Sequence, residues 1–143
     1  MPKTGLEVFS WDEVGYRPLI YSAGWQVALL NWEPPFDDLA RLGEIERHNQ
    51  SDEVFVLLKG RSVLFTLAED GLTTVDMAPG VVYNVTAGSW HNLIATRDAT
   101  WLIVENRETD LHDVEFRQMT AEEKQNLLGR LPDWTQTLDG KTV

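Results

Sequence analysis

Short runs of apolar residues, separated by turn-forming residues, repeat through most of the chain. The clearest alternation places Val63, Phe65 and Leu67 at every second position. Successive side chains of a strand point to opposite faces, so this pattern predicts a strand with one buried face. The Asp-Gly pair that follows at positions 70 and 71 favours a tight hairpin.

Further strands of similar length are expected on both sides of this hairpin. Each is bounded by Gly, Pro or Asp, as is typical of an antiparallel sandwich or barrel, so the predicted fold class is all-β. The predicted strands cover 7–11 (the weakest pattern), 16–21, 25–32, 44–48, 53–58, 61–68, 73–77, 81–85, 93–96 and 101–105.

The segment 25–32 differs from the others because it is nearly all apolar on both faces. A strand buried on both sides in a small barrel often meets a second subunit, which predicts a homodimer contact here. The alternative, a central core strand without a partner, stays equally open.

One helix is predicted, near the C-terminus. Thr120 and Glu123 have the spacing of a capping box, and Gly129 is expected to end the helix, giving a range of about 120–129. We expect this helix to be a lid packed on the edge of the barrel. With 143 residues, the chain is expected to form a single domain, 1–143.

Composition narrows the classes of partner. A formal net charge of −11 repels phosphate backbones, and the sequence has no compensating cluster of Lys or Arg, so nucleic acid is not an expected partner. No apolar run is long enough to span a bilayer, and the N-terminus lacks the apolar centre of a signal peptide. A cytoplasmic location without a membrane partner is therefore expected.

The residues that carry chemistry gather in two stretches, 43–60 and 80–95. Glu46 and His48 lie two positions apart and so share a strand face, and Glu53 opens the next strand after a polar turn. The second stretch reaches His91 through what is expected to be a turn. Two histidines and two or three carboxylates that converge from different strands predict a divalent-metal site.

These two stretches resemble the two motifs of the cupin family. The first family motif reads His-x-His, three or four residues, Glu, six residues, Gly; here it stands as Glu46-x-His48, four residues, Glu53, six residues, Gly60. The second reads Gly, five residues, Pro-x-Gly, two residues, His, three residues, Asn; here it stands as Gly80, five residues, Thr86-x-Gly88, two residues, His91, three residues, Ala95. Three positions depart from the family pattern, namely Glu46, Thr86 and Ala95.

The resemblance covers about residues 40–107 and implies a double-stranded β-helix, the jelly-roll barrel of cupins. It implies a divalent transition metal (Fe, Mn, Ni or Zn) held by His48, Glu53 and His91, with Glu46 as the fourth ligand or as a general base. An alternative alignment takes Gln50 as a ligand, but it fits the spacing to Glu53 less well.

Two functions remain open at this point. The first is a metal-dependent enzyme, an isomerase, lyase or oxygenase, that acts on a polar metabolite inside the barrel. The second is a non-catalytic binding or sensor protein without metal, in which Glu46 and His48 contact a sugar-like small molecule directly. Fold alone does not choose between them.

Three other residues are given structural roles. Trp90 is expected in the core rather than at the pocket, and His112 is expected in an exposed loop. Glu105, in the segment Glu105-Asn-Arg107 at the end of its strand, is expected to help close the barrel by a surface salt bridge.

Overall fold

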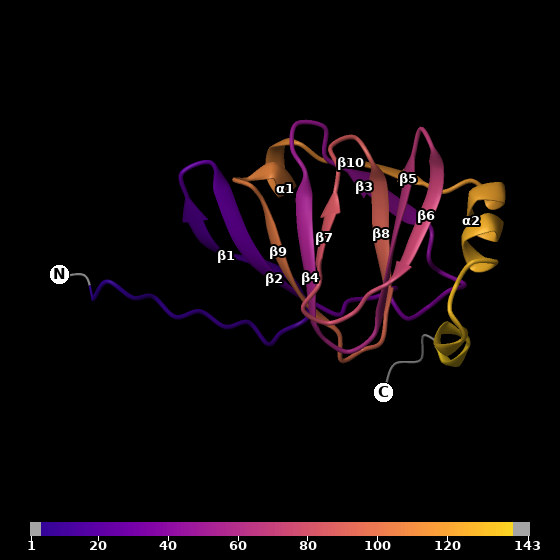
Figure 1. Ribbon diagram of the computed structural model, residues 1–143, viewed down its shortest axis with the longest axis horizontal. Coiled ribbons are helices and arrows are strands. Elements are labelled where there is room, and N and C mark those ends of the chain that lie inside the picture. Colours follow the sequence, from indigo (N-terminus) through magenta and orange to yellow (C-terminus); the bar gives the residue numbers. More distant parts are fainter. Residues whose placement is uncertain (1–3, 139–143) are drawn as a thin grey trace.

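Two antiparallel five-stranded sheets form the body of the molecule, as seen in a computed structural model that describes residues 4–138 (Figure 1). The first sheet has the order β1-β2-β9-β4-β7 and the second β10-β3-β8-β5-β6. The strands are β1 Gly15–Ser22, β2 Trp25–Asn31, β3 Glu44–Arg47, β4 Glu53–Lys59, β5 Ser62–Ala68, β6 Gly71–Asp76, β7 Val82–Val85, β8 Trp90–Ala95, β9 Thr100–Asn106 and β10 Glu115–Gln118. The predicted all-β class is confirmed.

The space between the sheets holds the larger apolar core. Phe55 and Trp101 come from the first sheet, while Leu64 and Leu93 come from the second. The ring of Phe36, from the connection before β3, packs edge-on against Trp101 at a centroid distance of 5.5 Å. Both sheets therefore turn one apolar face inward, as the alternating sequence pattern requires.

The second sheet buries its other face as well, against the C-terminal helices. Val63, Phe65 and Ile94 are fully buried in a second cluster that also contains Leu127. Leu127 belongs to helix α2 (Ala121–Leu128), which is followed by the 3₁₀ helix η1 (Asp133–Thr137). Both faces of β5 are therefore covered. The alternating residues Val63, Phe65 and Leu67 face the C-terminal helices, while Leu64 between them faces the core between the sheets.

Helix α2 begins as predicted, with a reciprocal capping box between Thr120 and Glu123, and ends before Gly129. It packs beside edge strand β6, so the expected position at the barrel edge is correct. The expected role as a lid is not supported, because the helix contributes no residue to the cavity between the sheets.

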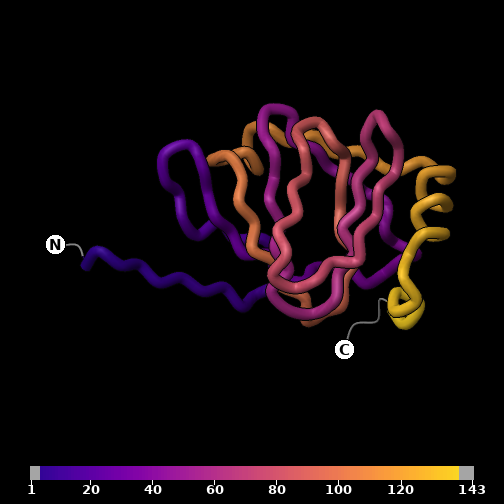
Figure 2. Tube along the Cα trace, in the orientation of Figure 1, coloured from indigo at the N-terminus to yellow at the C-terminus, as the bar shows by residue number. Residues whose placement is uncertain are grey.

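The larger differences between the predicted elements and the structure lie in three parts of the chain. Residues 7–11 are extended but pair with no strand, and Figure 2 shows this N-terminal stretch running outward from the barrel. Strand β8 starts at Trp90 rather than at residue 93, so His91 lies in a strand and not in a turn. Helix α1 (Thr109–His112) and strand β10 were not predicted, because only pairing with β3 makes a strand of the polar segment Glu115–Gln118.

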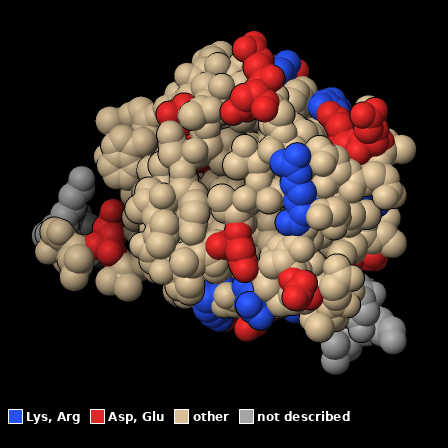
Figure 3. Space-filling model, turned by 45° about the vertical axis from the view of Figure 1, so that its right-hand side comes forward, with Lys and Arg blue, Asp and Glu red and all other residues tan. Residues whose placement is uncertain are grey.

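The described residues contain no helix long and apolar enough to cross a bilayer. On the face drawn in Figure 3, acidic and basic side chains lie in small separate groups, without a continuous basic patch.

Candidate metal centre

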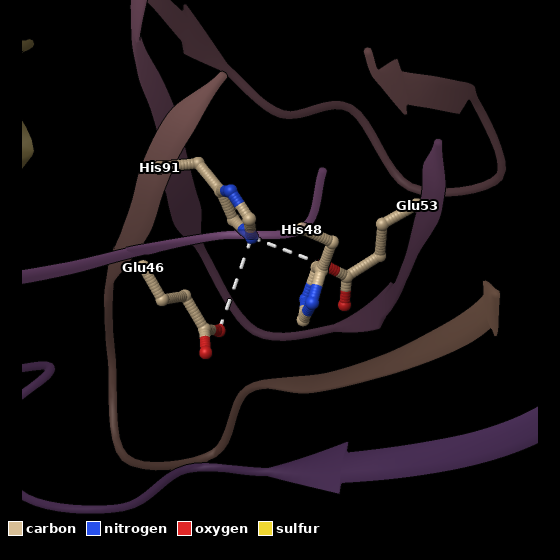
Figure 4. A group of neighbouring side chains, drawn as sticks. All are labelled: Glu46, His48, Glu53 and His91. Atoms are coloured by element: carbon tan, nitrogen blue, oxygen red, sulfur yellow. Dashed lines mark hydrogen bonds and ion pairs between the residues drawn. The ribbon is translucent and has the colours of Figure 1, made fainter. Parts of the chain in front are cut away.

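Glu46, His48, Glu53 and His91 converge at one end of the space between the sheets (Figure 4). Each of the four offers one nitrogen or oxygen, and these four atoms all lie within 4.8 Å of one another. Glu46 on β3 is paired in register with His91 on β8, and Glu53 opens β4 in the facing sheet. The structure thus brings together all four residues that the two motifs predicted.

Glu53 is at the centre of the group. Its Oε1 lies 3.1 Å from His48 Nε2 and 3.0 Å from His91 Nε2. His91 Nε2 lies 3.8 Å from Glu46 Oε1 on the other side. Ligands that bind one zinc-like ion at about 2.0–2.2 Å lie roughly 3–4 Å apart, so these separations fit a shared ion.

Backbone oxygens fix the orientation of both imidazole rings. His48 Nδ1 lies 2.6 Å from the backbone oxygen of Asp113, and His91 Nδ1 lies 3.1 Å from that of Ser89. A carbonyl only accepts, so each Nδ1 carries a hydrogen and donates it. Each Nε2 is consequently the nitrogen left for the centre, which is the arrangement that metal-binding histidines adopt.

Exposure separates the four side chains into two kinds. The side chains of His48, Glu53 and His91 are almost fully buried, whereas the side chain of Glu46 is 35% exposed. Three of the side chains are therefore enclosed by the barrel, and Glu46 is the one that faces open space. A site with this shape can keep a coordination position for water or for a ligand.

The charges of the group are strongly coupled. Burial lowers the pKa of His48, but the hydrogen bond and charge of Glu53, with smaller contributions from Asp113 and Glu46, together outweigh burial and raise that pKa to about 9. Burial raises the pKa of Glu53, but the hydrogen bonds and charges of the two histidines together outweigh burial and hold the pKa well below its usual range. For Glu46, burial and the neighbouring charge of Glu53 both raise the pKa. Without a metal, the group is thus an ion cluster centred on a Glu53 carboxylate.

The loops of the two motifs hold each other in place. Gly88 N–H donates to the backbone oxygen of His48 at 2.7 Å. The carboxylate of Asp52 accepts hydrogen bonds from Ala87 N–H and from the side chain of Asn84. Gly88 has a φ of +83°, a conformation that residues with a side chain rarely adopt, which explains the glycine in this motif.

Sequence reasoning missed the roles of two residues next to the site. Asp113, after α1, accepts hydrogen bonds from the backbone N–H groups of Asn49 and Gln50 and presents its own carbonyl to His48. Glu105 is buried, accepts a hydrogen bond from Tyr16 and lies near His48, so the expected surface salt bridge is wrong. Parity could have found Glu105, because it shares a strand face with the apolar Trp101 and Ile103.

The structure also shows where Gln50, Trp90 and His112 lie. Gln50 is exposed and lies outside the cluster, so the alternative ligand is not supported. Trp90 packs against the cluster of the second sheet and does not line the cavity, and the guanidinium groups of Arg47 and Arg117 both stack on its ring. His112 is exposed as expected, although it lies in α1 rather than in a loop.

A cavity of about 400 Å³ opens beside the cluster. The four cluster residues line it together with Glu105, and aromatic rings cover other parts of its wall. This volume lies near the lower end of the range of roughly 300–1,000 Å³ found for small-molecule sites, so the cavity suits a small metabolite.

Comparisons with known proteins give likenesses of structure only. No family model and no curated protein matches the chain. A Streptomyces protein, PAC13, solved with uridine, has a TM-score of 0.52 at 11% identity, over 80% of this chain and 87% of that one. A cupin-2 domain protein from Shewanella frigidimarina has a TM-score of 0.47 at 23% identity, over 68% and 85%. An oxalate oxidase in complex with glycolate has a TM-score of 0.44 at 14% identity, over 58% and 41%.

The topology shows which architecture the chain has. Each motif stretch contributes a strand to both sheets: β3 pairs with β8 in the second sheet, and β4 pairs with β7 in the first. The histidines and carboxylates of the two stretches meet at one end of the barrel. This is the double-sheet barrel that the motifs predicted, and the similarity to the Streptomyces protein supports the same architecture. The chain has the cupin fold.

Proposed function

We propose that this protein is a metal-dependent enzyme that acts on a small polar molecule in the barrel cavity. A divalent transition metal (Fe, Mn, Ni or Zn) would be held by His48, His91, Glu53 and Glu46. The observation that carries the proposal is the orientation of the two imidazole rings. Each Nδ1 is bound by a backbone carbonyl, and each Nε2 points at the same oxygen of Glu53.

The donor set favours these metals over others. Two imidazole nitrogens with carboxylate oxygens suit iron, manganese, nickel and zinc, while the all-oxygen sites preferred by calcium and magnesium lack histidine. The sequence contains no cysteine that would provide a soft thiolate ligand. The two carboxylates would balance the charge of a divalent ion.

The roles of the residues follow from their exposure. His48, His91 and Glu53 are enclosed and would serve only as ligands. Glu46 faces the cavity, so its carboxylate is placed either to complete the ligand set or to accept a proton from a bound molecule. A bound metal would act as a Lewis acid that polarises a carbonyl, carboxylate or hydroxyl group. Isomerase, lyase and oxygenase reactions all use a site of this kind.

Metal analysis of protein purified without chelator tests the proposal. We expect close to one equivalent of a transition metal in the parent protein, and its loss in the His48→Ala, His91→Ala double variant. His112→Ala is the matched control, because His112 is exposed and lies outside the cluster. Failure to bind iron, manganese, nickel or zinc even after reconstitution would exclude the metalloenzyme.

A second measurement separates an enzyme site from a closed structural metal. A catalytic site keeps a position for water, whereas a structural site is filled by protein ligands. We expect manganese-loaded protein to increase the relaxation rate of water protons strongly, and a bound ligand to reduce this effect. If the bound manganese increases the relaxation rate of water protons no more than manganese in a closed structural site does, the metal has no coordination position open to water.

A metal-free binding protein is the second candidate, and one observation favours it. The buried side chains already satisfy one another without an ion, because both histidines donate to Glu53 while their Nδ1 atoms donate to carbonyls. In this case Glu46 and His48 would contact a sugar-like ligand directly. The metal analysis decides between the two candidates.

We also propose that the protein is a homodimer. Residues 4–10 are all exposed, and the side chains of Leu6 and Val8 are 74% and 86% exposed on an extended segment. On the first sheet, Trp25 and Val82 also expose much of their apolar surface. Apolar side chains presented in this way support a contact with a second copy.

A further inference from the structure

Glu105 is a buried carboxylate that the metal centre does not use. It lies near the end of β9, opposite Glu53 in the strand pairing, and is only 5% exposed. Its Oε1 lies 3.8 Å from His48 Nε2, too far for a hydrogen bond. Glu105 is not part of the group of four whose ligand atoms lie close together. Membership of that group therefore does not explain why Glu105 is buried beside it.

The two oxygens of Glu105 have different surroundings. Oε2 accepts a hydrogen bond from the hydroxyl of Tyr16. Among the described residues, Oε1 has no hydrogen-bond partner although it is buried. A buried polar atom without a partner costs free energy, and a native protein keeps one where a ligand or another group satisfies it.

A network behind Glu105 holds this arrangement in place. Gln26 lies opposite Glu105 on β2, and its Nε2 donates to the Tyr16 hydroxyl and to Asp110, both at 2.9 Å. The side-chain oxygen of Gln26 accepts from the backbone N–H of Glu108 at 2.7 Å. Gln26 and Tyr16 are therefore engaged, and among the described residues of this network Glu105 Oε1 is the buried acceptor without a partner.

The charge of the cavity wall determines which kind of ligand can donate a hydrogen bond to Glu105 Oε1. None of the described residues that line the cavity is a lysine or an arginine. The acidic residues in the lining are Glu33, Glu44, Glu46, Glu53, Glu105 and Asp110. His48 and His91 also line the cavity, and, despite burial, the neighbouring carboxylates raise the pKa of both histidines. The six acidic residues outnumber these two histidines, so the wall favours a cation over an anion.

We propose that the cavity takes a small molecule with a protonated amine, whose N–H group donates to Glu105 Oε1. The inference rests on the proposed function, because the other polar end of the ligand would then lie at the metal beside Glu46 and His48. The cavity volume of about 400 Å³ suits a small metabolite of this class. The acidic residues that line the cavity would favour entry of the cation.

Three probes with the same two-carbon skeleton test the charge preference: ethanolamine, ethylene glycol and glycolate. Their binding is followed by NMR titration of metal-loaded protein and of chelator-treated protein. In chelator-treated protein, ethanolamine should bind at least about tenfold more tightly than glycolate. Glycolate that binds as tightly as ethanolamine there would overturn the proposal, and so would ethylene glycol that binds as tightly.

The Glu105→Gln variant tests the residue itself, with Glu122→Gln as the control. Glu122 is exposed on α2, so the same chemical replacement there leaves the cavity untouched. Glu105→Gln should weaken ethanolamine binding at least about tenfold and leave glycolate binding to metal-loaded protein unchanged. Unchanged ethanolamine binding would overturn the proposal. If the variant does not fold, the relative affinities of the three probes for the parent protein still test the proposal.

Metal content keeps the two proposals separate. We expect Glu105→Gln to hold as much metal as the parent, and a loss of metal would identify Glu105 as a ligand and overturn its assignment to the amine. Absence of metal from the parent protein would overturn the proposed metalloenzyme function but not the preference for an amine. The relative affinities of the three probes for chelator-treated protein do not depend on the metal ion.

Discussion

His48 donates its Nδ1 hydrogen to the backbone oxygen of Asp113, 2.6 Å away, although 65 positions separate the two residues. The side chain of Asp113 also accepts from the N–H groups of Asn49 and Gln50. The turn between β3 and β4 is therefore fastened to the segment between α1 and β10. This contact determines which ring nitrogen of His48 faces the metal centre.

Replacing Asp113 by alanine should weaken metal binding by about 10–100-fold, as is usual when a partner that orients a metal ligand is lost. The two N–H groups would lose their acceptor, and the carbonyl that holds His48 would shift with them. The measurement is the affinity for zinc by competition with a chromophoric chelator. Asp113→Asn keeps one side-chain carbonyl and should recover part of the loss, while Asp12→Ala, in an exposed position, should change nothing. Equal affinity in Asp113→Ala and the parent would refute the positioning role.

Metal binding should release protons and depend on pH. Without metal, both nitrogens of His48 face acceptors. Burial lowers the pKa of His48, but the hydrogen bonds and the neighbouring carboxylate charges together outweigh burial and raise that pKa to about 9. A metal takes the place of the Nε2 proton, so the apparent affinity should rise about tenfold per pH unit for each proton released, up to about pH 9. Titration in weak buffer with a pH indicator counts these protons. An affinity that does not change between about pH 6 and about pH 9 would contradict the coupling.

The stability of the metal-free protein should change in the opposite direction. The pKa of His48 is higher in the folded state than its ordinary value of 6.5. Its contribution to the free energy of unfolding is therefore fully present below about pH 6.5 and is lost as the pH rises towards 9. Thermal unfolding of chelator-treated protein should show a lower midpoint at about pH 9 than at about pH 6. The His48→Ala variant should lack this part of the pH dependence.

Gly60, the last residue of the first motif, should not tolerate a side chain. Its φ is +80°, and a Cβ there would meet the backbone of Ala99 at 2.6 Å. Gly71 has a φ of +105° but open space around it, so it is a matched control. Gly71→Ala should cost about 1–2 kcal/mol of unfolding free energy from backbone strain alone, and Gly60→Ala should cost clearly more. Equal costs in urea unfolding would show that the contact with Ala99 relaxes.

Light scattering coupled to gel filtration tests the proposed homodimer. The parent protein should elute with twice the mass of one chain. The Leu6→Ser, Val8→Ser double variant should shift towards one chain, because it removes apolar surface from the extended N-terminal segment. Glu7→Ser, in the same segment, should keep the mass of the parent. A parent mass of one chain would refute the dimer.

Much of the site could be predicted because its residues obey local rules. His48, Glu53 and His91 stand at the spacing of two motifs, and the capping box of Thr120 marks the start of α2. These signals depend on a few neighbouring positions. Strand parity adds that Trp101, Ile103 and Glu105 share a face, so the burial of Glu105 was also within reach of the sequence.

The rest depends on contacts between distant segments. The carbonyl of Asp113 has no sequence signature, because every residue carries one. The polar segment Glu115–Gln118 becomes a strand only through its pairing with β3. Conversely, residues 7–11 have a weak strand pattern but find no neighbouring strand within the described chain, so they stay unpaired. Tertiary pairing therefore overrides local preference at both ends of the molecule.

The most direct test of the metal centre is an anomalous X-ray diffraction map of crystals grown with the metal found by elemental analysis. We predict a single strong peak within about 2.0–2.2 Å of His48 Nε2, His91 Nε2 and a carboxylate oxygen of Glu53, with Glu46 completing the set or facing the peak. A map of fully loaded protein without a peak among these residues, or with the metal bound elsewhere, would contradict the assignment.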